Sequence, residues 1–152
     1  MPWVAFHKWK QAQLDGQSQP NAPVDFNNDS IALLLLKSTA DPATNVGTWE
    51  DVADAVASSA EVTGTNYARK DLTGVTVTLS GGTVTVDASD PTAYAQDASG
   101  FDNARYAILY KKATADASAP VIAYYDFGSN KGNTTGSLTL QFSSTSGIFT
   151  FS

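Results

Sequence analysis

The stretch LTGVTVTLSGGTVTVDA, residues 72–88, constrains the fold of this chain more than any other. Valine and threonine alternate over 72–79 and again over 82–88, which is the period of a strand with one face toward the core. Between these segments, Ser80, Gly81 and Gly82 form a tight connection that is typical of a β-hairpin. The pattern therefore predicts an antiparallel hairpin whose valines face inward and whose threonines face outward.

Five further segments carry strand patterns. The run IALLLL is continuously apolar rather than alternating, which predicts a strand buried on both faces. Both faces of the stretch RYAILYKKATADASAPVIAYYDFG, residues 105–128, are also apolar, so its two strands are expected at the centre of the fold or under a neighbouring subunit. About seven strands in all predict a mainly β chain, a single antiparallel β-sandwich over residues 16–152. The five additional strands are expected at Ser30–Ser38, Arg105–Lys111, Val121–Phe127, Ser137–Phe142 and Ile148–Phe151.

Two short segments have helical character. Residues 1–15 are predicted to form a short N-terminal helix or arm, because Trp3, Lys10 and Leu14 fall at roughly helical spacing. A second short helix is expected near 48–58, with Thr48 as its N-cap and acidic residues in its first turn. Together with the strands, this predicts a β-sandwich decorated on one side.

Composition and charge exclude several classes of partner. The net charge is −6, only 16% of the residues are charged, and no run of Lys or Arg exists, which argues against nucleic-acid binding. The longest apolar run is six residues, against the about 20 that span a bilayer, so no membrane partner is expected. The N-terminal residues lack the features of a signal peptide. We therefore expect a soluble protein that is made in a cytoplasm.

The residue types that usually carry catalysis are scarce. There is no cysteine, the only histidine is His7, and no nucleophile elbow surrounds any serine. Thirteen of the fifteen acidic residues are aspartates, most of them in loops, where they usually form Asx turns. No segment has the spacing of a calcium loop. The sequence therefore predicts a protein that is not an enzyme, with no cofactor and no metal site.

The aromatic residues of the arm have two interpretations. Trp3, Phe6 and Trp9 are costly to leave in water, since burial of each ring is worth about 1.5–3 kcal/mol or more. The arm either folds back and caps one end of the sandwich, or it docks on a neighbouring subunit, where Trp is a common anchor. The sequence leaves both alternatives open.

Six stretches follow one another along the chain: KQAQLDGQ, SIALLLLKS, TWEDVADAV, VTGTNYARKDLTGVTVTL, RYAILYKKATADASAPVIAYYDFG and GSLTLQFSSTSGIFTFS. In this order they resemble a family of small virion proteins of tailed bacteriophages that are commonly encoded near the major capsid protein. The resemblance covers most of the chain. This sequence departs from the family pattern between Val56 and Glu61, where it has the run ASSA, and after Tyr67, where it has AlaArgLys in place of a Gly-rich turn.

The resemblance implies a capsid decoration or cement protein that clamps adjacent subunits of the major capsid protein. It implies a homo-oligomer, with a trimer preferred, located on the capsid surface of the virion and made in the cytoplasm of the host bacterium. A neck, head-to-tail or tail component is the alternative. It also suggests fold-determining positions at Tyr67, Gly74, Tyr106, Tyr110, Asp126 and Gly128. The residues expected at the interface are Trp3, Phe6, Trp9, Leu14, Arg69 and Lys70.

A second class of function is a module that binds carbohydrate or a host surface. Exposed aromatic rings stack on sugars, and the candidate rings are Tyr94, Phe101, Tyr124 and Tyr125. Tyr124 and Tyr125 are consecutive in a predicted strand, so only one of the two rings can face outward.

Overall fold

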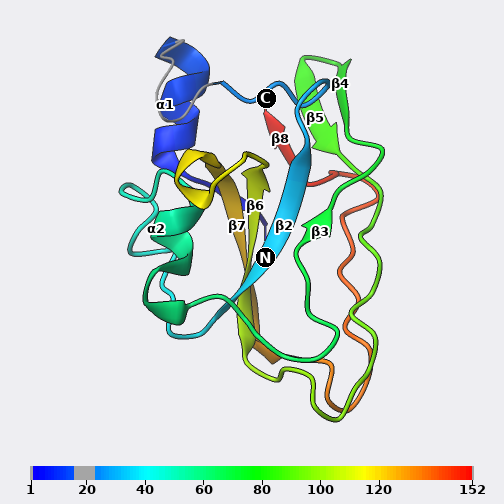
Figure 1. Ribbon diagram of the computed structural model, residues 1–152. Helices are drawn as coiled ribbons and strands as arrows, with labels where there is room; N and C mark the ends of the chain where they lie inside the picture. Colours follow the sequence, from blue (N-terminus) through cyan, green and yellow to red (C-terminus); the bar gives the residue numbers. More distant parts are fainter. Residues whose placement is uncertain (1, 16–22, 152) are drawn as a thin grey trace.

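Two antiparallel sheets form the body of the molecule (Figure 1). The computed structural model describes residues 2–15 and 23–151. The larger sheet has five strands in the order β1-β7-β6-β2-β3, and the smaller sheet has three in the order β4-β5-β8. The mainly β, sandwich-like fold predicted from the sequence is confirmed. The strands are β1 (Val4–Ala5), β2 (Ile31–Lys37), β3 (Lys70–Asp71), β4 (Thr76–Ser80), β5 (Thr83–Asp87), β6 (Ala104–Lys111), β7 (Val121–Lys131) and β8 (Phe149–Phe151). The helices are α1 (His7–Asp15) and α2 (Val52–Val56), with short 3-10 helices η1 (Ala57–Ser59) and η2 (Asp116–Ser118).

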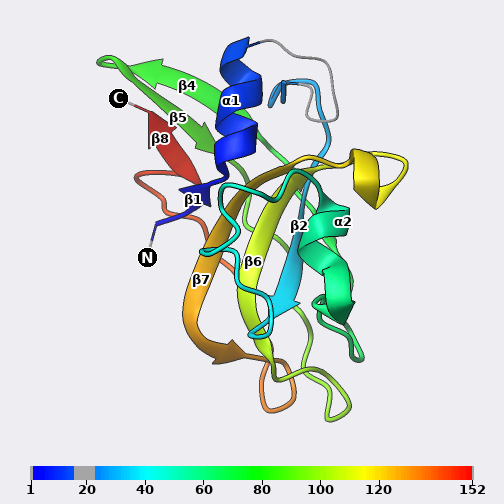
Figure 2. The same cartoon turned by 90° about the vertical axis from the view of Figure 1, so that its left-hand side faces the viewer.

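The buried strand β2 lies inside the larger sheet, between β6 and β3. Its residues 31–36 are each at most 2% exposed, which explains the unbroken apolar run IALLLL. The two helices lie on one side of β2, while β3, the smaller sheet and long extended segments lie on the other (Figure 1). The view turned by 90° shows β6 and β7 running alongside β2 (Figure 2). The sequence prediction of a strand covered on both faces is thus confirmed.

β6 and β7 form a long hairpin inside the larger sheet. Ile108 lies opposite Tyr124, and the register shifts near both ends of β6. Residues 107–110 of β6 are all buried, because β6 pairs with β2 on one edge and with β7 on the other. The prediction that the segment 105–128 is a central hairpin is therefore confirmed.

The second predicted hairpin is formed by β4 and β5. Ser80 pairs with Thr83 across the two-residue turn Gly81-Gly82. Both glycines have positive φ, 56° and 85°, as a type I′ turn requires. A side chain at either position would be strained by this backbone, which is why glycine occupies both.

The strand predicted at 137–142 is wrong. This segment forms a single bridge, in which the backbones of Leu138 and Tyr94 exchange hydrogen bonds of 2.9 and 3.0 Å. Side-chain oxygens take backbone N–H groups on either side of the bridge. The Asp90 carboxylate accepts from the Phe142 N–H at 2.7 Å, and the hydroxyl of Ser137 accepts from the N–H of Gln96 at 3.2 Å. Among the described residues, no further backbone pairing extends this bridge into a ladder.

The second helix begins later than the sequence suggested. Its N-cap is Asp51, whose side chain accepts a hydrogen bond of 3.1 Å from the Asp54 N–H. Thr48 instead donates its hydroxyl to the carbonyl of Asn45 and belongs to the preceding turn. The α-helix covers only 52–56 before it passes into η1, where Ser58 and Ser59 adopt positive φ. The predicted helix near 48–58 exists, but the assignment of Thr48 as its cap is wrong.

Asn133 joins three loops at the end of the molecule opposite α1. It is fully buried, and its amide nitrogen donates to the carbonyls of Ala95 and Thr65 at 2.7 and 3.1 Å. Its amide oxygen accepts from the Phe101 N–H at 2.8 Å. Gly100 lies so close to this amide that a Cβ there would be 2.0 Å from the oxygen. One side chain thereby bonds three backbone groups outside the strands, of which the Phe101 N–H is the buried one.

We expect Asn133→Ala to lower the free energy of unfolding by about 2–3 kcal/mol, because the buried Phe101 N–H loses its acceptor and the Thr65 carbonyl loses the Asn133 donor. Urea unfolding followed by fluorescence measures this change. The matched control is Asn130→Ala on the exposed end of β7, which is expected to stay within about 0.5 kcal/mol of the parent. Equal midpoints for the two variants would contradict the role assigned to Asn133.

Candidate functional site

The N-terminal arm folds back onto its own chain. β1 extends the larger sheet, with Val4 opposite Tyr124, and the Phe6 N–H donates to the carbonyl of Ile122 at 3.0 Å. Phe6 is fully buried between the rings of Trp49 and Tyr124, with centroids 6.0 and 5.7 Å away. Of the two alternatives left open by the sequence, the structure shows the arm packed on the body of the same molecule.

The residues predicted to form an interface lie in three different settings. Phe6 and Trp9 are buried in the core of the chain, and Trp3 is half-buried against Tyr125 and Phe142. Leu14 is 90% exposed at the end of α1. Arg69 and Lys70 lie away from the arm and engage neighbours of their own, described below. The six residues therefore do not form one surface, and Leu14 is the member with an apolar side chain open to solvent.

The smaller sheet has one apolar and one polar face. Cross-strand pairing places Val77, Val86 and Phe149 in one row, and Leu79, Val84 and Phe151 in the next, all on the same face. The other face carries a row of threonines: Thr78, Thr85 and Thr150. The predicted alternation is thus confirmed, but coverage of the apolar face decreases from Val86, which is 2% exposed, to Leu79, which is 73% exposed.

An apolar groove lies between this face and α1. Its volume is about 410 Å³, and Lys10 is the one ionisable residue in its lining. Trp9 contributes to the lining, and its indole N–H is buried without a hydrogen-bond partner among the described residues. The groove is lined by Trp9, Lys10, Gln13, Leu14, Phe26, Val77, Val84, Val86 and Phe151.

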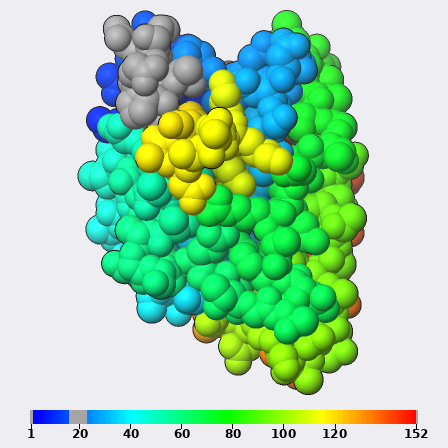
Figure 3. Space-filling view, in the orientation of Figure 1, coloured from blue at the N-terminus to red at the C-terminus, as the bar shows by residue number. Residues whose placement is uncertain are grey.

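Three exposed apolar side chains line this groove, Leu14, Val77 and Phe151, at 90, 39 and 45%. A fourth, Leu79, is 73% exposed and lies opposite Val84 of the lining. We call these four residues the apolar surface. In the space-filling view, α1 lies at one upper corner of the molecule and the β4–β5 hairpin at the other (Figure 3). Sequence reasoning identified Leu14 but missed the other three, because alternation indicates which face is apolar but not whether anything covers it. A charge-free stretch from 72 to 86 was the available signal.

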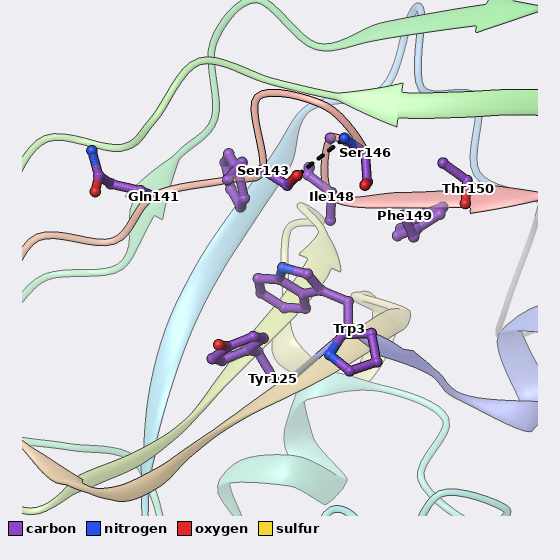
Figure 4. A pocket seen from close by; sticks show the side chains of 11 residues that line it. Trp3, Tyr125, Gln141, Ser143, Ser146, Ile148, Phe149 and Thr150 are labelled. Atoms are coloured by element: carbon purple, nitrogen blue, oxygen red, sulfur yellow. Dashed lines mark hydrogen bonds between the residues drawn. The ribbon is translucent and has the colours of Figure 1, made fainter.

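A second groove, of about 520 Å³, opens between the arm and the C-terminal segment (Figure 4). The rings of Trp3 and Tyr125 lie at one wall with centroids 5.7 Å apart. The opposite wall is formed by residues 141–150, where the Ser143 hydroxyl accepts from the Ser146 N–H at 3.0 Å. Among the described residues, the lining of this aromatic groove consists of apolar, aromatic and uncharged polar residues. Its lining is Pro2, Trp3, Tyr125, Gln141, Phe142, Ser143, Ser146, Gly147, Ile148, Phe149 and Thr150.

The rings proposed for sugar binding are mostly unavailable. Tyr94 and Phe101 are buried, at 1 and 3% exposure, and pack edge-to-face with centroids 5.6 Å apart. Tyr124 packs against Phe6. Tyr125 is the member of the predicted set that lines the aromatic groove.

Arg69 ties two loops together. Its guanidinium donates to Glu61 at 2.7 and 2.9 Å and to Asp116 at 2.7 and 2.9 Å. The Tyr67 hydroxyl also donates to Glu61 at 2.7 Å, and burial raises the pKa of Tyr67 above its usual range. The hydrogen bonds from Arg69 hold the pKa of Asp116 below its ordinary value. Because both hydrogen-bonding edges of the guanidinium are occupied, this cluster stabilises the contact between the two loops.

Lys70 follows Arg69 in the chain but has different partners. Its ammonium lies 4.7 Å from the centroid of the Tyr94 ring, within range of a cation–π contact, and donates to the Thr92 hydroxyl at 3.2 Å. Both basic residues of the predicted interface thus stabilise their own chain.

The described residues hold no group of side chains with the composition of a metal centre. Within 2–15 and 23–151, no three His, Cys, Asp or Glu side chains are grouped so that they could hold a metal ion. His7 is exposed at the first turn of α1. Loop aspartates form Asx turns as predicted: Asp25 accepts from the Asn27 N–H, and Asp97 from the Ser99 N–H. In the same part of the chain, no helix has the length and apolar character to cross a bilayer.

Comparison with known proteins identifies no relative: no family model, curated protein or solved structure matches this chain.

We expect the stabilising effect of Asp116 to depend on pH. The pKa of Asp116 in the folded protein is lowered from the ordinary value of 3.8. Its contribution to the free energy of unfolding is therefore present above that value and is lost as the pH falls through the folded pKa. Asp116→Asn should therefore be less stable than the parent at pH 7, by about 0.5–1 kcal/mol for this partly exposed pair. The difference should shrink below about pH 4. Denaturant titrations at pH 7 and pH 3 measure it, and a difference that grows on acidification would contradict this electrostatic role.

Proposed function

We propose that this chain is a structural component of a tailed-bacteriophage virion, a decoration or cement protein that binds the major capsid protein on the outside of the head. The proposal rests on the sequence resemblance and on the apolar surface. It assigns no catalysis to the protein. It further assigns a homo-oligomeric state, for which the resemblance implies a trimer.

The observation that carries the proposal is the uncovered apolar surface at one end of the molecule. Leu14 and Leu79 alone are 90 and 73% exposed, and no charged side chain occurs between 72 and 86 to oppose desolvation of the hairpin. Burial of a leucine side chain is worth about 1.5–3 kcal/mol, so a partner that covers this surface gains affinity without any polar contact. Clustered exposed apolar side chains are typical of sites of protein association.

The geometry also suits repeated attachment to a shell. A surface of four side chains is small for a tight one-to-one complex, which commonly buries about 1,600 Å². On a lattice, linked copies raise one another's effective concentration, and modest contacts then give firm attachment.

Replacing both leucines of the apolar surface, as Leu14→Ser with Leu79→Ser, is expected to weaken binding to shells of the cognate major capsid protein at least about tenfold. Both side chains are exposed, so the thermal midpoint should change little. Co-sedimentation with shells measures the bound fraction. The control pair is Thr76→Ser with Thr78→Ser on the same strand, which leaves the apolar side chains in place.

If the double leucine variant decorates shells as well as the parent does, the assignment of this surface as the capsid contact is wrong. The copy number in purified particles separates the decoration role from its alternative. About one copy per capsid protein is expected for decoration, whereas a neck or tail component would be present in only a few copies.

A second candidate function, binding of a neutral saccharide, is favoured by the aromatic groove. Trp3 and Tyr125 supply rings for stacking, and Gln141, Ser146 and Thr150 supply uncharged hydrogen-bonding groups in the same lining. A glycan array probed with the purified protein tests it, with Trp3→Ala as the variant and Val4→Ala as the neighbouring control. Binding of at least one neutral glycan that is lost in Trp3→Ala alone is the expected result, and an array without any bound glycan would remove this candidate.

A further inference from the structure

The outer edge of β4 is an unprotected strand edge. β4 is the terminal strand of the smaller sheet, and all five of its residues are exposed. Edges of this kind are usually blocked by a charge, a proline or a bulge. None of these occurs here: the pairing with β5 is regular from Thr76 to Ser80, and residues 72–86 contain neither charge nor proline. In the described part of the chain, nothing pairs with this edge.

The hairpin register determines which backbone groups point outward. Ser80 and Thr83 flank a two-residue turn, so they form a hydrogen-bonded pair, and the pairs alternate from there along the ladder. Thr78 therefore directs its N–H and C=O toward β5. Val77 and Leu79 direct theirs away from β5, toward the open edge. Two donors and two acceptors are thus available to a further strand.

The sequence of β4 is complementary to itself in one antiparallel register. With Thr78 on a two-fold axis, Val77 lies opposite Leu79 of a second copy, Thr76 lies opposite Ser80, and Thr78 meets its own counterpart. Val77 and Leu79 are the residues with outward backbone groups, so four interchain hydrogen bonds form. Apolar side chains also meet apolar ones, and polar meet polar.

We propose that two copies of this chain pair through β4 in this register, joining their smaller sheets into one six-stranded antiparallel sheet. The occupant of the edge is a second copy because the register satisfies every outward backbone group and matches both faces at once. The pairing places the apolar surfaces of the two copies on the same side of the joined sheet. It uses the strand edge, whereas the proposed capsid contact uses the apolar face, so one molecule can make both contacts.

A single cysteine tests the register, since the chain has no cysteine of its own. In the proposed pairing, the Cα atoms of the two Thr78 residues form a non-hydrogen-bonded pair about 4.5 Å apart, within the range of a disulfide. Thr78→Cys should therefore give covalent dimers under mild oxidation. The control is Thr85→Cys on the same polar face, whose two copies would be three strand spacings, about 14 Å, apart. A Thr78→Cys dimer yield no higher than that of Thr85→Cys overturns the proposal.

Charge substitution gives a second, reversible readout that does not depend on oxidation. Thr78→Lys places two like charges together across the axis, so self-association measured by sedimentation equilibrium should weaken several-fold, as should that of Thr78→Glu. An equimolar mixture of the two variants should recover association through heterodimers. Equal association of parent, single variants and mixture would overturn the proposal, as would a parent that stays monomeric at high micromolar concentration.

Failure here is distinguishable from failure of the proposed function. The edge variants keep Leu14, Leu79 and Phe151 in place, and shell binding is scored separately by co-sedimentation. Loss of pairing with retained shell binding would refute the edge contact alone. Retained pairing with no shell binding would refute the capsid assignment alone.

Discussion

The rest of the structure depends on burial of β2. Six consecutive apolar residues, 31–36, can be withdrawn from water only if both faces of the sheet around them are covered. The helices and the arm cover one side, and the extended C-terminal segments with the smaller sheet cover the other (Figure 1). The aromatic rings of the arm belong to this covering layer, which is why Phe6 and Trp9 are buried in the body of the molecule.

The arrangement leaves one end of the molecule incompletely covered. The apolar face of the smaller sheet is buried near Val86 and open near Leu79. Several polar groups, by contrast, have partners within the chain: Arg69, Asn133 and the loop aspartates Asp25 and Asp97 are hydrogen-bonded to neighbours. The uncovered features used in the proposals above are therefore the apolar surface and the open edge of β4.

The sequence predicted those parts of the fold whose signals are local. The two hairpins at 76–87 and 104–131 follow from alternation and turn residues, and β2 follows from its unbroken apolar run. The segment 137–142 was predicted wrongly: it forms a single bridge with Tyr94, and its Phe142 N–H donates to the side chain of Asp90. Both partners are distant in sequence, so no local pattern indicates them. The start of α2 was misplaced because two residues, Thr48 and Asp51, were both chemically suited to the cap. The position of the arm and the exposure of Leu79 depend on which elements pack against each other in the folded chain. A local sequence pattern does not contain that information.

The pairing of β1 with β7 has a consequence for the order of events during synthesis. Val4 lies opposite Tyr124, so 120 residues separate the two partners along the chain. The larger sheet cannot be completed until β7 has left the ribosome, and contacts of such long range form late and slowly. The apolar surface draws on Leu14 and Phe151, from opposite ends of the described chain. A nascent chain therefore lacks the complete apolar surface until translation has passed residue 151. The proposed capsid contact cannot form before that point.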